Sequence, residues 1–145
     1  MLTISFMNAV DTTTLEKTIA NLATALDLLA KARTPDELWM ARNSAVLEFT
    51  LCWARVRPSL ERALINLDAL DHDEVKHMSL ASLVRAANER GYTTVEWERW
   101  DEFRKARNSA AHEYREEIAD VILGEAKQFL PAISQIATKI REKSR

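Results

Sequence analysis

The sequence predicts an all-α fold, an antiparallel up-and-down bundle of four to five helices in a single domain over residues 1–145. The first observation is that 145 residues include only two glycines and three prolines, whereas glycine alone averages about 7% of protein residues. Hairpins and Rossmann turns need residues with positive φ, so β and α/β architectures are disfavoured. With Gly91 and Gly124 standing alone, no Walker loop or dinucleotide fingerprint can be written. The second observation is the helical periodicity of apolar residues along most of the chain.

The charge balance and the single cysteine exclude further classes. Twenty Lys and Arg against twenty-two Asp and Glu give a net charge of −2, so any contact with RNA is expected to be local. Cys52 excludes a disulfide framework and is expected to be a buried thiol. No apolar run reaches the roughly 18 residues of a membrane span. Residues 1–12 are expected to be a loose leader without the features of a signal peptide, which predicts a cytoplasmic protein.

The first two helices are expected to begin near residues 13 and 35. Thr13 opens a sequence typical of a capping box, and apolar residues then follow one helical face. Thr34 is the expected N-cap of the second helix, with Pro35 at its first position. Pro58 is expected to kink or end this helix at the preceding residue. The expected core face of this helix consists of Trp39, Val46, Phe49, Trp53, Val56 and Leu60.

The polar segment 68–77 is expected to be a connection. It holds side chains of metal-ligand types, namely Asp71, His72, Asp73, Glu74 and His77. Their spacing matches neither an EF-hand nor an HExxH site, so a solvated loop and no metal are predicted. After it, Ser79 is the expected cap of a short helix, and Gly91 is expected to end that helix in the left-handed conformation.

Two more helices are expected in the last third of the chain. Thr93 is the expected cap of a helix that carries Trp97, Trp100 and Phe103. The last helix is expected from about residue 114 to 143, with a bend at Pro131.

The four tryptophans all fall at helical spacing. Core packing is expected for Trp39 and Trp53. Trp97 and Trp100 are compatible with the core or with a partner surface, because aromatic residues are enriched at interfaces.

The most informative segment is 104–117, RKARNSAAHEYREE. Its pentapeptide ARNSA occurs twice, at 41–45 and at 106–110. Only the second copy is followed by a histidine and a tyrosine, His112 and Tyr114, while Leu47 stands at the position equivalent to His112 in the first. Any functional signal therefore comes from these two residues beside the pentapeptide.

Helix geometry limits how the polar residues of this segment can cooperate. At about 100° per residue, Asn108 and His112 share one face, and Arg104 extends that stripe by a turn. Arg107 lies about 140° around the helix from His112. The two side chains can meet at one phosphate if the helix loosens before Tyr114 or if two copies pair across a symmetric dimer. The spacing favours a composite site or no site.

The run RNSAAHEY at 107–114 resembles the RNxxxHxY form of the Rx4–6H motif of the HEPN superfamily (higher eukaryotes and prokaryotes nucleotide-binding domains). Three flanking segments are similar to this superfamily's second, short third and last helices: EFTLCW at 48–53, LVRAANERGY at 83–92 and FLPAI at 129–133. The similarity is greatest to HepT toxins and the related nucleotidyltransferase substrate-binding proteins.

The resemblance implies a HEPN-like bundle that forms a homodimer with facing motif helices, and a metal-independent endoribonuclease without cofactor. Arg107 would hold or polarise the scissile phosphate, and His112 would move protons to and from the attacking 2′-hydroxyl and the leaving oxygen. Asn108 would orient that pair, with Arg104 in a supporting position.

The resemblance also implies a toxin–antitoxin module with a separately encoded minimal nucleotidyltransferase (an MNT-type antitoxin). This partner would modify Tyr114 with AMP, and the added phosphate charge would disfavour RNA binding. Two alternatives stay open. The chain could be a non-catalytic substrate-binding subunit of a two-component nucleotidyltransferase, or a scaffold in which the motif residues only join the dimer.

Overall fold

The computed structural model describes residues 9–112 and 115–145. Over these residues the chain forms seven helices and no strand, which confirms the all-α class. The helices are α2 (Thr13–Lys31), α3 (Pro35–Trp53), α4 (Val56–Asn66), α5 (His72–Lys76), α6 (Leu80–Glu89), α7 (Trp97–His112) and α8 (Glu116–Lys143). Of the expected leader, residues 1–8 lie outside the described residues.

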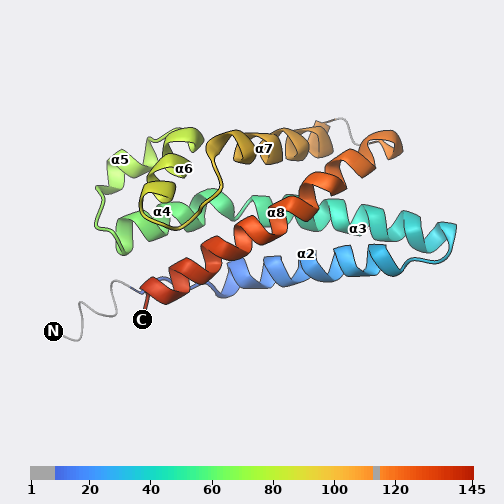
Figure 1. Cartoon of the computed structure of the whole chain (residues 1–145), viewed down its shortest axis with the longest axis horizontal. Coiled ribbons are helices and arrows are strands. Elements are labelled where there is room, and N and C mark those ends of the chain that lie inside the picture. Colours follow the sequence, from blue (N-terminus) through green and yellow to red (C-terminus); the bar gives the residue numbers. More distant parts are fainter. Residues whose placement is uncertain (1–8, 113–114) are drawn as a thin grey trace.

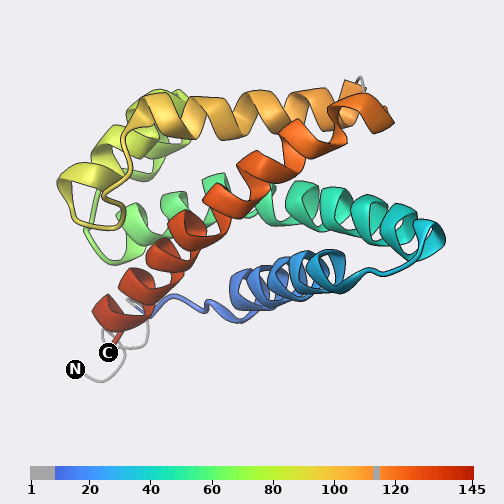
Figure 2. The ribbon, with the colours of Figure 1, turned by 45° about the vertical axis from the view of Figure 1, so that its right-hand side comes forward.

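The long helices run in alternating directions (Figure 1). Helices α2 and α3 form a hairpin, α4 to α6 form a compact group at one end, and α7 leads back from that group. Helix α8 then crosses the others obliquely and contacts α2, α3, α4 and α7 (Figure 2). It ends beside the start of α2, where the Val10 N–H donates to Ser144 Oγ at 3.3 Å. Helix α8 therefore closes the core.

Local signals correctly place two helix starts. The Thr34 hydroxyl accepts from the Glu37 N–H at 3.1 Å, and Pro35 occupies the first helical position of α3. The Ser79 hydroxyl accepts from the Ser82 N–H at 3.1 Å at the start of α6. At α2 the arrangement differs, because the helix begins at Thr13 itself and the carboxylate of Asp11 accepts the Thr13 N–H at 2.9 Å.

Pro58 does not end the second helix where the sequence predicted. Helix α3 stops at Trp53, and Pro58 lies in the first turn of α4, which begins at Val56. The physical reason is that an unbroken helix would bring the Pro58 ring against the carbonyl of Ala54, with no N–H to bond it. A break four residues earlier removes that clash, and proline is tolerated in the first turn of the new helix.

The segment 68–77 contains a helix rather than only a connection. Helix α5 occupies 72–76, and the carboxylate of Asp71 caps it by accepting the Glu74 N–H at 3.0 Å. The His77 Nδ1 lies 2.6 Å from the backbone oxygen of Asp73. In 9–112 and 115–145, no group of three or more His, Cys, Asp or Glu side chains is placed to hold a metal ion.

Gly91 ends α6 as predicted, with a φ of +80°. The N–H groups of Gly91 and Tyr92 bond to the oxygens of Asn88 and Ala87, at 3.1 and 3.0 Å, which is a Schellman motif. Thr93, by contrast, does not cap α7. Its hydroxyl accepts from the N–H of residue 95 at 3.1 Å, and α7 begins at residue 97.

Helix α8 spans Glu116–Lys143 and continues through Pro131. In the part of the chain that the structure describes, no helix is long and apolar enough to cross a membrane.

The core is built around Phe129 of α8. Its ring contacts four aromatic rings from α3 and α7, with centroid distances of 5.3 to 6.0 Å, namely those of Phe49, Trp53, Trp100 and Phe103. Trp100 is fully buried and so belongs to the core. The expectation for Trp39 is wrong, since this side chain is 62% exposed. The buried residues of α3 begin only at Ala45, so the first turns of this helix extend beyond the core.

Candidate functional site

The motif residues lie on the last turns of α7, which is helical from Trp97 to His112. The helix therefore does not loosen between Arg107 and His112, and the two side chains leave it about 140° apart. Loosening of the helix was one of the two ways in which these side chains could meet on a single phosphate. It does not occur in the described part of α7, which ends at His112. Tyr114 lies outside the described residues.

Arg107 is half-buried and lines an open pocket of about 250 Å³ between α3, α4, α6 and α7. Its Nη1 donates to the side-chain oxygen of Asn108 at 3.3 Å. Its Nε is buried without a hydrogen-bond partner, and no carboxylate of the described residues forms an ion pair with it. A buried N–H without a partner is costly, so this guanidinium is poised for an acceptor that residues 9–112 and 115–145 do not supply.

A second guanidinium, that of Arg57, lines the same pocket. Its Nη1 donates to the Met78 oxygen at 3.1 Å and lies 3.6 Å from the carboxylate of Glu61. Glu61 is buried and is shared with Lys76, whose Nζ lies 3.3 Å away. Arg57 is thus held in place by its own partners while its charge adds to that of Arg107.

Sequence reasoning missed Arg57. No spacing relates residue 57 to residue 107, and the proximity arises because the break between α3 and α4 redirects the chain. The remaining wall of the pocket includes the half-buried ring of Trp53 and the side chain of Leu80. Two cations beside a flat aromatic surface can hold a phosphate together with an attached planar group.

The other predicted site residues have different surroundings. His112 is exposed at the end of α7. Arg104 is engaged within its own helix, because its Nε and Nη2 donate to the Asp101 carboxylate at 2.8 and 2.5 Å. These bonds, with a further contribution from Lys105, hold the pKa of Asp101 below its usual range. Releasing Arg104 toward a ligand would require breaking this pair.

The repeated pentapeptide offers an internal comparison. Arg42, the arginine of the first copy, lies 3.5 Å from Glu116 and 3.4 Å from Asp120 of α8. Its guanidinium therefore links α3 to α8. Arg107, at the same place in the second copy, has no such carboxylate among residues 9–112 and 115–145. The same five residues thus carry one arginine tied into the fold and one facing a pocket.

Comparisons with family models, with curated protein sequences and with solved structures found no match to this chain.

Proposed function

We propose that this chain is the toxin-type subunit of a two-gene toxin–antitoxin module, a HEPN-like helical bundle that acts as a homodimeric, metal-independent endoribonuclease. One observation carries the proposal: Arg107, without a carboxylate partner among the described residues, faces an open pocket five residues before an exposed histidine. The resemblance of RNSAAHEY to the HEPN motif supports the same reading.

In the proposed reaction Arg107 binds the scissile phosphate and stabilises the charge that develops on its oxygens. The Asn108 side chain holds the Arg107 guanidinium through their 3.3 Å hydrogen bond. A histidine takes the proton of the 2′-hydroxyl as its oxygen attacks phosphorus, and a proton is returned to the leaving 5′-oxygen. The products are a 2′,3′-cyclic phosphate and a free 5′-hydroxyl.

The active site is proposed to be composite. Because Arg107 and His112 point about 140° apart on one helix, each site combines Arg107 of one chain with His112 of the partner subunit.

The proposed nucleotidyltransferase partner binds a stripe of exposed apolar side chains on α3. The stripe is formed by Met40, Leu47 and Leu51, which are 65%, 56% and 47% exposed.

Subunit complementation tests the composite site. Arg107→Ala and His112→Ala are each expected to abolish RNA cleavage, and co-expression of the two variants is expected to restore it. With random pairing, half of the dimers are mixed and each has one intact site, so about a quarter of wild-type activity should return. The control is Arg42→Ala, which alters the other ARNSA copy and should retain cleavage. No recovery on mixing, with both variants folded and dimeric, contradicts the composite site.

The proposed regulation is AMP transfer to Tyr114. Intact-protein mass spectrometry after co-expression with the neighbouring nucleotidyltransferase should show added AMP, and Tyr114→Phe should remove it. Tyr92 is the matched control, because the other tyrosine of the chain is fully buried and cannot be reached in the folded state.

The alternative is a non-catalytic substrate-binding subunit. Three acidic residues in the first turns of α8, just after the motif, favour this alternative because they repel an RNA backbone. They are Glu116, Glu117 and Asp120. Under this alternative the purified chain binds a nucleotide and the nucleotidyltransferase, yet leaves RNA intact. Cleavage that requires Arg107 would contradict it.

A further inference from the structure

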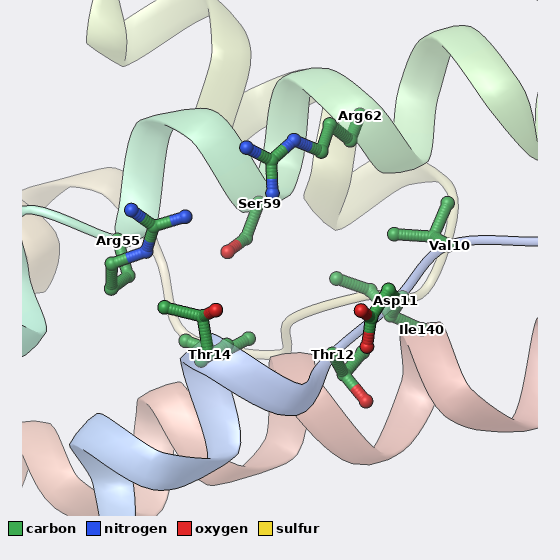
Figure 3. Close-up of a pocket in the computed structure, with 9 residues that line it drawn as sticks. Val10, Asp11, Thr12, Thr14, Arg55, Ser59, Arg62 and Ile140 are labelled. Atoms are coloured by element: carbon green, nitrogen blue, oxygen red, sulfur yellow. The ribbon is translucent and has the colours of Figure 1, made fainter.

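A second basic pocket lies on the opposite face of α4 from Arg57. Arg55, Ser59 and Arg62 are spaced four and three residues apart, so they share one helical face, while Arg57 is turned about 160° away from Arg55. The three residues line a pocket together with the start of α2 and the end of α8 (Figure 3). This pocket is separate from the one that holds Arg107.

The two guanidinium groups of this pocket outnumber its one carboxylate, that of Asp11. Figure 3 shows Arg62 of α4 and Arg55, the residue just before α4, with their head groups turned toward each other beside Ser59. Neither arginine forms an ion pair with a carboxylate in the described part of the chain. The Arg55 Nε is buried without a hydrogen-bond partner. Two cations that face each other repel, and a buried N–H without an acceptor is costly, so a bound anion would relieve both.

Hydroxyl groups also line the pocket, beside the apolar side chains of Val10, Leu15 and Ile140. The Ser59 side chain is 5% exposed, and Figure 3 shows the hydroxyls of Ser59 and Thr14 beside the Arg55 head group. Asp11 is the one acidic lining residue, and its carboxylate accepts the N–H and the hydroxyl of Thr13 at 2.9 and 2.6 Å. One negative charge is thus set against two positive ones.

The size of the pocket defines how an anion would sit. Its enclosed part measures about 10 Å³, which is room for one water-sized oxygen atom. One oxygen of a tetrahedral anion would enter between Arg55 and Ser59. The other oxygens would remain at the mouth, beside the exposed Arg62.

We propose that this pocket binds a phosphate group, either inorganic phosphate or a small phosphate monoester. Arginine head groups and hydroxyls match phosphate oxygens in charge and in donor geometry.

The test uses the full chain carrying Arg107→Gln, so that the other pocket does not contribute. Inorganic phosphate and glycerol 3-phosphate are titrated separately at constant ionic strength, by isothermal titration calorimetry and by thermal unfolding. Saturable binding with a rise in melting temperature is expected. Arg55→Gln and Arg62→Gln should each weaken it by about tenfold or more, since each removes charge-assisted hydrogen bonds. Arg85→Gln, on the exposed face of α6, is the matched control and should leave binding unchanged.

Arg62 is exposed, so its variant should fold even if Arg55→Gln does not. Tighter binding of glycerol 3-phosphate identifies a monoester as the ligand, and binding of inorganic phosphate alone identifies the free ion. The proposal is overturned if neither probe binds saturably, as expected of a pocket that holds only a water molecule. It is also overturned if Arg62→Gln titrates like Arg85→Gln. Because every arm lacks Arg107, the result is independent of the ribonuclease test.

Discussion

The substitution Phe129→Ala should remove the central aromatic contact of α8 with α7 and α3. The Phe129 ring is fully buried and packs on four aromatic rings, at 5.3 Å from Phe49, 5.5 Å from Phe103, 5.9 Å from Trp53 and 6.0 Å from Trp100. Truncating a buried phenylalanine costs about 3 to 5 kcal/mol. Aromatic pairs in these tilted and edge-to-face geometries add to burial, so the upper part of that range, about 4 kcal/mol, is expected.

This loss should be measured by urea denaturation, followed by circular dichroism and by tryptophan fluorescence. For a chain of this size a change of about 4 kcal/mol corresponds to a drop in melting temperature of roughly 12 °C. The control is Val121→Ala on the same helix, where the side chain is 69% exposed and the expected change is within about 0.5 kcal/mol. Phe129→Leu keeps most of the apolar volume and should fall between the two.

A Phe129→Ala cost below about 1.5 kcal/mol would contradict this prediction, since it would lie under the range for a buried ring. The loss should also extend to function. Helix α7 carries Arg107 and packs on this cluster through Phe103. The Phe129→Ala variant should therefore lose RNA cleavage at a lower temperature than the Val121→Ala variant.

Two further predictions concern the two glycines and the cysteine of the chain. Gly91→Ala should destabilise by about 1 kcal/mol, because φ is +80° there although a Cβ would meet no atom within 4 Å. Gly124→Ala, inside α8 where a Cβ also meets no atom within 4 Å, should raise the free energy of unfolding by about 0.5 to 1 kcal/mol. If urea denaturation shows that both substitutions change the free energy of unfolding in the same direction, this contrast is contradicted. Burial raises the pKa of Cys52 from 9.0 to about 11, so the unfolded chain loses its proton first and stability should fall as pH rises from 9 to 11. Cys52→Ala should show a shallower fall over that window, and identical pH profiles would exclude the effect.

Some features of the fold follow from the sequence because the interacting groups are close along the chain. Thr34 and Pro35 start a helix through contacts within one turn. Gly91 ends one because only glycine adopts positive φ without cost. Pro58 shows the limit of such rules, since the proline predicts a break but not that the break falls four residues before it.

The candidate site shows the same division. The sequence places Arg107, Asn108 and His112 on one helix, and the structure confirms that helix. The sequence does not indicate Arg57, which lies in the pocket of Arg107 only because the chain turns between α3 and α4. Nor does the ARNSA pentapeptide distinguish Arg107 from Arg42, because its five residues are the same in the two copies.

The sequence is enough to show that this protein is helical, where α3 and α6 begin and where α6 ends, because capping and periodicity depend on neighbours three or four residues away. The tertiary structure alone decided that Trp39 is exposed while Trp100 is buried, and that Arg42 is paired while Arg107 faces a pocket. Burial and ion pairing depend on which distant segments of the chain lie opposite a side chain, and residue spacing along one helix does not indicate those segments.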